Sequence, residues 1–387
     1  MSFVNTDKEY VAGTYARFPL ALTEGCGALL YDENEKEYID MGSGIAVNTF
    51  GIADDEWLQA ITEQAAILGH TSNLYYTKPC ADLAELLCKR TGMKKVFFSN
   101  SGAEANECAI KTARRWALQN KGEGNHTIIT LKNSFHGRTI TTLAATGQDS
   151  FHTEFGPFTE GFVYAEANNL ESVKSLADEY NCAAIMMEAI QGEGGIYVLE
   201  EDFVKGVFEI AKEKNMLVIF DEVQTGNGRT GKLYAYMHYG VTPDIVSTAK
   251  GLGGGLPLGC TMLGEKVKDT LTPGSHGSTF GGNPICCAGA LSILSRIDDN
   301  LLKDVTAKSE YILSRLNGAK GVKSVSGKGF MLGIETEKPA KEVIASAMEK
   351  GVLVLSAKTK VRLLPPLNIT FDLLEIAMDK LLEAIAE

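Results

Sequence analysis

Residues 216–222 read MLVIFDE, an unbroken apolar run followed at once by two carboxylates. Four more short apolar runs stand between about residues 95 and 265, separated by segments of helix length. Runs without polar alternation that alternate with helices are typical of buried parallel strands in an α/β sheet. The five predicted strands are KVFF (95–98), TIIT (127–130), AAIMM (183–187), MLVIF (216–220) and DIVST (244–248).

One intervening helix can be predicted residue by residue. It begins after the break at residues 99–102, where Ser99, Asn100 or Ser101 can cap its first turn. Small or aromatic side chains then recur every three or four residues, while charged side chains occupy the other faces. The apolar face holds Ala105, Ala109, Ala113, Trp116 and Ala117.

The two ends of the chain have a different pattern. The polar turn DENEKE (32–37) separates ALLY from YIDM and predicts a β-hairpin. After about residue 300, the pattern predicts an amphipathic helix, short strands and a final helix. We expect both ends to form one smaller α+β domain beside a large sheet domain. The expected limits are 1–50 for the N-terminal part of the small domain, 51–295 for the large domain and 296–387 for the C-terminal part.

Composition excludes several classes of function. The net charge of -12 opposes binding to phosphate backbones, and the densest basic runs are mere pairs, so we expect no nucleic-acid partner. We expect no membrane segment, because no window holds about 18 consecutive apolar residues, and no secretory signal at the N-terminus. The eight cysteines form no C-x-x-C and the six histidines no H-x-x-x-H. These patterns predict buried thiols, a cytoplasmic location and no metal site.

The residues that follow the predicted strands carry the chemistry, because ligands of parallel sheets bind beyond the carboxyl ends of the strands. MLVIF leads into Asp221, and DIVST leads into Lys250 and the glycine-rich GLGGGLPLG. KVFF leads into residues 101–103 at a helix start, where free N–H groups can hold an anion. TIIT leads into Phe135 and Arg138. Each alone has an ordinary alternative, such as a helix cap or a solvated strand end.

Together, these side chains would surround one ligand with a phosphate cup, a carboxylate, an amine and an aromatic face. Pyridoxal phosphate (PLP) uses all four, since its aldehyde bonds to an amine and its ring nitrogen needs an anionic partner. The sequence therefore predicts a PLP enzyme in which Lys250 supplies the amine and Asp221 the carboxylate.

Several long motifs in this order resemble those of the class III (subgroup II) aminotransferases. They are FFSNSGAEANECAIKTAR, SFHGRT, DEVQTGNGRTG and PDIVSTAKGLGGGLPLG, within a resemblance that runs from residue 14 to near residue 370. The resemblance implies a fold type I PLP-dependent transferase of the α/β class, with a large, mixed but mostly parallel sheet domain and a smaller α+β domain. It also implies an obligate homodimer. Relatives usually read GHxHP where this chain reads GIADDEW (51–57), a departure that concerns a loop before a helix.

The resemblance also implies a role for each cofactor residue. Lys250 would bond to the cofactor and transfer protons, and Asp221 would pair with its ring nitrogen. Gln224 would hydrogen-bond the phenolic oxygen, and Phe135 would stack on the ring. Ser101, Gly102 and Ala103 would hold the phosphate.

The remaining implied roles concern the substrate and the partner subunit. Thr279 would complete the cofactor site across the dimer interface, with Ser278 as a further substrate-binding candidate beside it. Arg138 and Arg362 would receive substrate carboxylates, as guanidinium forks suit. Glu193 would cover Arg362 when the amine substrate has no nearby carboxylate, and the substrate pocket would also be lined by Tyr15.

The implied reaction moves the δ-amino group of N2-acetyl-L-ornithine to 2-oxoglutarate, as in arginine biosynthesis. Ornithine, succinylornithine, succinyldiaminopimelate and 4-aminobutyrate are alternative donors, because family members share the catalytic set. GNGRTG (226–231) also spells the dinucleotide-binding G-x-G-x-x-G, but residues 221–225 separate it from the strand, which disfavours a nicotinamide dehydrogenase. A non-catalytic binding protein on this scaffold would not need the lysine, carboxylate and phosphate cup together.

Overall fold

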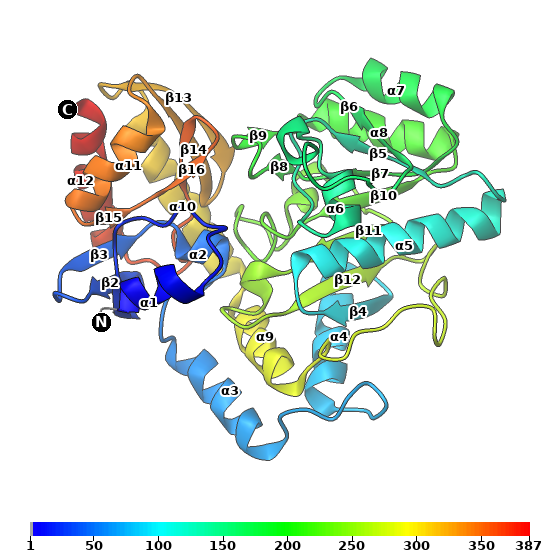
Figure 1. The fold of residues 1–387 in the computed structure, drawn as a ribbon, viewed down its shortest axis with the longest axis horizontal. Helices are drawn as coiled ribbons and strands as arrows, with labels where there is room; N and C mark the ends of the chain where they lie inside the picture. Colours follow the sequence, from blue (N-terminus) through cyan, green and yellow to red (C-terminus); the bar gives the residue numbers. More distant parts are fainter. Residues whose placement is uncertain (1–2) are drawn as a thin grey trace.

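The computed structural model describes residues 3–387, and its largest sheet has seven strands in the order β4-β12-β11-β10-β7-β5-β6 (Figure 1). Neighbouring strands pair in parallel except at β12, which is antiparallel to both β11 and β4. The five predicted strands are confirmed, and β6 and β12 were not predicted. The strands are β4 (Lys95–Ser99), β5 (Thr127–Leu131), β6 (Phe162–Ala165), β7 (Cys182–Met187), β10 (Leu217–Asp221), β11 (Ile245–Thr248) and β12 (Gly259–Leu263).

Strand β10 shows why these runs carry no polar alternation. Leu217 and Ile219 belong to one hydrophobic cluster, whereas Val218 and Phe220 belong to another. Successive side chains of a strand point to opposite faces, so both faces of the sheet are covered. Burying each such side chain contributes roughly 1.5–3 kcal/mol, and this burial holds the sheet between its helices.

The predicted helix after β4 is confirmed as α5 (Gly102–Lys121). Ser101 caps it by accepting a hydrogen bond from the Glu104 N–H. The predicted alanines and Trp116 are buried, and the small alanines let the helix lie against β11 and β12. Asn106 is a polar exception on this buried face.

The two ends of the chain meet in a second body, on the left of Figure 1. The predicted hairpin is confirmed as β2 and β3, and β15 pairs in parallel with β3, which joins distant segments in one sheet. A further sheet has the order β13-β14-β17-β16. The domain limits 1–50, 51–295 and 296–387 stay a prediction. The strands of this body are β1 (Leu22–Cys26), β2 (Leu29–Asp32), β3 (Glu37–Asp40), β13 (Val322–Lys328), β14 (Met331–Thr336), β15 (Val352–Leu353), β16 (Leu355–Ala357) and β17 (Lys360–Leu363).

The other elements connect and cover these sheets. In the atypical GIADDEW segment, Asp54 caps α3 through the Trp57 N–H and pairs with Arg296 at 2.7 Å. The further helices and short pieces are α1 (Phe3–Tyr10), α2 (Ser43–Ala46), α3 (Asp55–Ile67), α4 (Lys78–Thr91), α6 (Ile140–Ala145), α7 (Leu170–Glu179), α8 (Glu201–Glu213), α9 (Pro284–Arg296), α10 (Asp299–Leu316), α11 (Ala340–Glu349), α12 (Phe371–Ala386), β8 (Ile190–Gln191), β9 (Tyr197–Val198) and the 3-10 turns η1 (Asp149–Phe151), η2 (Ala235–Tyr239) and η3 (Lys250–Leu252).

Two kinds of feature are absent from residues 3–387. Within that range, no helix is long and apolar enough to cross a membrane. The same described residues hold no group of three or more His, Cys, Asp or Glu side chains arranged to bind a metal ion.

Candidate active site

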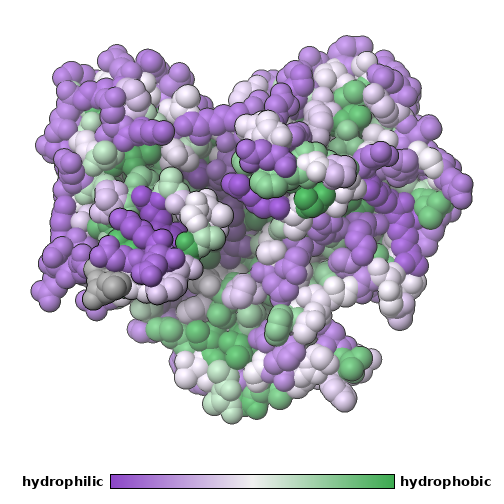
Figure 2. Space-filling model, viewed as in Figure 1, coloured by the Kyte–Doolittle hydropathy of each residue, from purple (hydrophilic) through white to green (hydrophobic). Residues whose placement is uncertain are grey.

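A cavity of about 480 Å³ lies where the chain leaves the carboxyl ends of the central strands. Space-filling Figure 2 shows the molecule hollowed between its two bodies. Lys250 and Asp221 both line this cavity. Its lining also contains Ser101, Gly102, Ala103, Phe135, Arg138 and Gln224.

Asp221 ends β10 and is only 3% exposed. Its Oδ2 atom lies 2.7 Å from Asn106 Nδ2 and 2.8 Å from His136 Nδ1, and its Oδ1 accepts the Val223 N–H at 3.0 Å. The bond to His136 requires the proton on Nδ1. A buried carboxylate is tolerated when hydrogen bonds replace its hydration, so these donors stabilise and orient the charge.

Lys250 follows β11 and begins η3 with a positive φ of 44°. A non-glycine residue in this left-handed region carries strain of roughly 1–2 kcal/mol, of the kind that is found at functional sites. Burial lowers the pKa of Lys250, against the nearby Glu193 and Asp221 carboxylates, while Arg362 lowers it further. A lowered pKa increases the share of free amine at neutral pH, which suits a nucleophile.

The start of α5 forms an anion-binding cup. The amides of Gly102 and Ala103 belong to the first helical turn, which lacks intrahelical acceptors. A Cβ added to Gly102 would lie 2.6 Å from Val223 Cγ1, so this close approach requires glycine. The cup, the Phe135 ring, the amine and the carboxylate together fit a phosphorylated pyridine aldehyde.

Arg362 and Glu193 form an ion pair beside the cavity. Arg362 Nη1 lies 2.6 Å from Glu193 Oε1 and donates to Gln224 Oε1 at 3.1 Å, with the arginine side chain 4% exposed. Burial acts to raise the pKa of Glu193, but Arg362 and the other donors bring it below its ordinary value. Gln224 therefore connects this ion pair to the cavity that holds Lys250.

Arg138 is exposed and lines the same cavity. Its guanidinium carbon lies 4.7 Å from the centre of the Phe151 ring and 5.8 Å from that of Phe135. Such contacts hold the charged group over aromatic faces and leave its donors available to an incoming anion.

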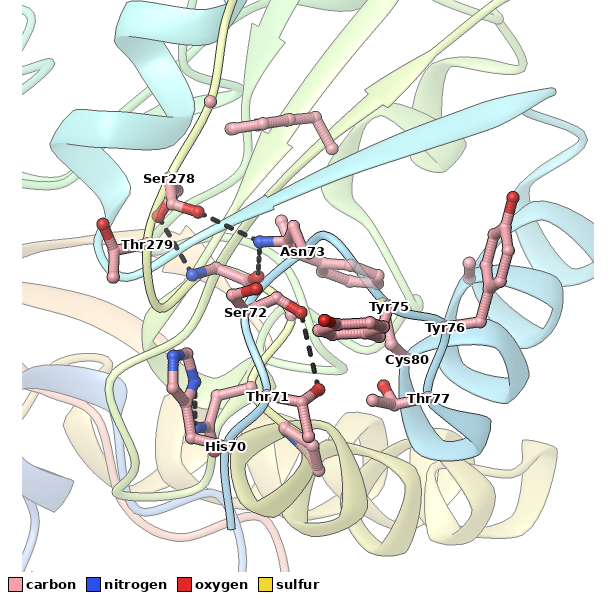
Figure 3. A pocket seen from close by; sticks show the side chains of 18 of the residues that line it. His70, Thr71, Ser72, Asn73, Tyr75, Tyr76, Thr77, Cys80, Ser278 and Thr279 are labelled. Atoms are coloured by element: carbon pink, nitrogen blue, oxygen red, sulfur yellow. Dashed lines mark hydrogen bonds between the residues drawn. The ribbon is translucent and has the colours of Figure 1, made fainter. Parts of the chain in front are cut away.

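Thr279 and Ser278 line a different cavity, of about 460 Å³, together with Asn73 and Tyr75 (Figure 3). Ser278 Oγ accepts hydrogen bonds from Asn100 Nδ2 at 3.2 Å and from the Gly281 N–H at 2.9 Å. The structure therefore does not bring these two hydroxyl residues to the Lys250 cavity of their own chain. Their role across an interface stays a prediction.

Tyr15 also lies apart from the predicted site. Its side chain is 73% exposed, and the ring centre is 5.5 Å from the guanidinium carbon of Arg17. Neither of the two cavities described above includes Tyr15 in its lining.

Sequence reasoning did not assign Asn106, His136 or Glu188 to the site. Glu188 accepts the Phe135 N–H at 2.9 Å and the Gly192 N–H at 3.0 Å, and burial raises its pKa. Two signals in the sequence could have indicated these residues. Glu188 directly follows the β7 run, and His136 lies inside the SFHGRT motif. Asn106 offered only a polar side chain on an apolar helix face.

The class-III aminotransferase family profile matches residues 10–385. The chain is 46% identical to an acetylornithine aminotransferase of Haemophilus ducreyi over 383 residues, covering 98% of each protein. It is 45% identical to one of Aquifex aeolicus, covering 97% of this chain and 100% of the relative.

Solved structures agree with these similarities. An ornithine aminotransferase of Toxoplasma gondii, described with PLP at its active site, aligns with a TM-score of 0.94 at 31% identity, covering 99% of this chain and 94% of the other. An acetylornithine aminotransferase of Elizabethkingia anophelis aligns with a TM-score of 0.88 at 31% identity, covering 99% and 98%.

Proposed function

The chain belongs to the class-III aminotransferases, and from this premise we propose that it moves the δ-amino group of N2-acetyl-L-ornithine to 2-oxoglutarate. The products are N-acetyl-L-glutamate 5-semialdehyde and L-glutamate, as in arginine biosynthesis. The observation that carries the chemistry is the meeting of Lys250 and Asp221 in one cavity with the anion cup of α5. The substrate is supported by the full-length relatives named above.

Enzymes of this family depend on PLP, and the cavity offers a partner for each part of it. We propose that Lys250 Nζ bonds to the aldehyde, Asp221 pairs with the ring nitrogen and Gln224 meets the phenolic oxygen. Phe135 would stack on the ring, and residues 101–103 would hold the phosphate. When bound, the cofactor supplies an electron sink for the negative charge that develops at the substrate carbon.

Lys250 also supplies the proton transfer. With the cofactor and an amine substrate bound, the Nζ atom would be placed to take a proton from the substrate carbon and to return it on the cofactor side. Burial lowers the pKa of this amine below its ordinary value, which increases the share of the unprotonated form. Asp221 is held in place by hydrogen bonds from Asn106, His136 and the Val223 N–H.

The two arginines distinguish the two substrates by their carboxylates. N2-acetylornithine carries its carboxylate far from the reacting amine, where the exposed Arg138 can bind it. Arg362 then remains covered by Glu193, as it is in the structure. 2-Oxoglutarate has a second carboxylate close to its reacting carbon, and this group would replace Glu193 on Arg362.

We further propose a homodimer in which Thr279 reaches the site of the partner subunit. Tyr75, which is 70% exposed, lines the Thr279 cavity together with the exposed Tyr76. Leu74 at 85% and Phe280 at 61% are exposed beside lining residues in the chain. Such a gathering of exposed apolar groups marks an interaction surface.

The eight cysteines are all free thiols, which supports the proposal of a reducing, cytoplasmic location.

A substrate panel tests the proposed donor. With 2-oxoglutarate as acceptor, kcat/KM would be measured for N2-acetylornithine, ornithine, succinylornithine, succinyldiaminopimelate and 4-aminobutyrate. We expect N2-acetylornithine to exceed free ornithine clearly. Parity or reversal would overturn the proposed donor and leave the aminotransferase class standing.

A further inference from the structure

Asn106 is a buried amide on an otherwise apolar face of α5. It is 1% exposed, and its helix neighbours Ala105 and Ala109 are fully buried. A buried amide without partners costs roughly 1–3 kcal/mol, so such a group must find hydrogen bonds. Asn106 forms hydrogen bonds with Ser247, with the His136 carbonyl oxygen and with Asp221, the carboxylate of the proposed site.

The hydrogen bonds form a directed chain. Ser247 Oγ donates to Asn106 Oδ1 at 2.5 Å, and Asn106 Nδ2 donates to Asp221 Oδ2 at 2.7 Å. The same Nδ2 group donates to the His136 carbonyl oxygen at 2.7 Å. The Asn106 oxygen faces a hydroxyl donor, whereas its nitrogen faces two acceptors. Only one orientation of the amide therefore satisfies all of these hydrogen bonds.

The sheet register places the ends of this chain together. Asp221 on β10 pairs directly with Ser247 on β11. Cross-strand partners project to the same face, and α5 packs on that face at β11 and β10. Asn106 therefore connects β10 and β11 through hydrogen bonds to Asp221, the last residue of β10, and to Ser247 on β11.

We infer that Asn106 is a positioning residue, oriented by Ser247, that fixes the Asp221 carboxylate for its pairing with the ring nitrogen of the cofactor. The inference rests on the proposed function and deepens it. Asn106 and His136 hold the same oxygen, Oδ2, from two directions, which prevents rotation about the Cβ–Cγ bond. Without the amide, His136 alone holds that oxygen.

The experiment compares Asn106→Ala, Ser247→Ala and the double variant as PLP-loaded proteins. Asn120→Ala is the control, because Asn120 lies on the same helix and its Nδ2 donates within that helix, to the Trp116 carbonyl oxygen at 2.8 Å. The readouts are the pH midpoint of the visible absorption of the bound cofactor, the PLP dissociation constant, the split between kcat and KM, and the thermal midpoint of the apoprotein.

We expect Asn106→Ala to lower kcat by about 10- to 100-fold, the value of a hydrogen bond to a charged group. The absorption midpoint should move to higher pH, since a ring with less positive charge leaves the nitrogen that joins it to Lys250 more basic. Ser247→Ala should act in the same direction but less. The double variant should equal Asn106→Ala alone, because the serine acts through the amide.

Three results would overturn the inference. The first is a wild-type kcat and absorption midpoint in Asn106→Ala. The second is a loss of apoprotein stability with an unmoved midpoint, which would show a purely structural role. The third is independent, multiplying effects of the two substitutions.

Two further outcomes are also decisive. If Asn106→Ala does not fold or does not bind PLP, the pH midpoint of the absorption of Ser247→Ala is the deciding measurement. A wild-type midpoint in Ser247→Ala would then overturn the inference. Failure of the wild-type protein to bind PLP removes the proposed function and the inference with it, and this outcome is distinguished because it needs no variant.

Discussion

At the scale of single residues, neighbouring groups set the charges of the cavity. Burial lowers the pKa of Lys250 and raises that of Glu188, whereas Arg362 holds the pKa of Glu193 low. The lowered pKa of Lys250 favours its free amine, and the lowered pKa of Glu193 favours the ionised carboxylate that covers Arg362. Desolvation favours the neutral form of Glu188.

Removing the charge of Glu193 should separate the two half-reactions. In Glu193→Gln, Arg362 loses its ion pair and becomes available to substrate carboxylates. We expect KM for 2-oxoglutarate to fall several-fold and the half-reaction with N2-acetylornithine to slow. Single-turnover measurements with each substrate check this, and unchanged values for both would contradict the gating role.

Lys250 and Asp221 were predictable because each follows an apolar strand, and strand ends of a parallel sheet meet at one edge. Asn106 was not predictable, since a lone polar residue on a helix face does not reveal its partner. Neither was the position of Tyr15, which lies in a segment whose surroundings depend on long-range packing.

At the scale of elements, the start of α5 combines an electrostatic attraction for anions with close packing around Gly102. The positive end of the helix dipole and the free amides attract an anion. The absence of a side chain at Gly102 lets Val223 pack against the cup.

Gly102→Ala should weaken cofactor binding. The new Cβ would lie 2.6 Å from Val223 Cγ1, and the displacement of the cup should raise the PLP dissociation constant about tenfold. Removing the obstructing methyl groups in Gly102→Ala/Val223→Ala should recover part of the affinity. Gly13→Ala is the control, because its Cβ would meet nothing within 4 Å. Unchanged affinity in Gly102→Ala would contradict the predicted phosphate cup.

The turn η2 depends on a buried carboxyl, Glu222, which accepts the Ala235 and Tyr236 N–H groups. Burial raises the pKa of Glu222 from 4.5 to about 7. Between these pH values the folded chain keeps a proton that the unfolded chain has released. Its stabilising contribution is therefore full below about pH 4.5 and is lost as the pH rises to about 7, about 3 kcal/mol in total.

Glu222→Gln tests this pH dependence. The variant should be less stable at every pH, because an amide N–H₂ group would face backbone donors. Its free energy of unfolding should nevertheless fall less than that of the wild type between pH 5 and pH 7.5, as measured by denaturant titration. Parallel curves for the two proteins would refute the assignment of the proton to Glu222.

At the scale of the whole molecule, the sheet that joins β3 to β15 depends on segments more than 300 residues apart, so the sequence pattern predicts its strands but not their pairing. The strands β5, β7, β10 and β11 were predictable because every residue in them is buried. The fifth predicted strand, β4, is a partly buried edge strand, and it was predictable from its apolar run Val96–Phe98. Strand β12 was not, since it follows the glycine-rich loop closely. The edge strand β6 is only partly buried and carries a weaker apolar signal.

The proposed homodimer predicts complementation between inactive chains. A hybrid of Lys250→Ala and Thr279→Ala subunits would contain one site with both wild-type residues. Mixing the two variants under subunit exchange should restore about a quarter of the wild-type activity, as random pairing in a two-fold dimer requires. Activity no greater than that of the separate variants would contradict the crossing of Thr279.

The central claim, that one cavity holds PLP between Lys250 and Asp221, is tested most directly by locating the covalent attachment. The loaded protein would be reduced with borohydride, digested and mapped by mass spectrometry. We predict that the cofactor mass lies on the peptide containing Lys250 and is lost in Lys250→Ala. Attachment to a different lysine, or no attachment in a protein that still transfers amino groups, would contradict the account.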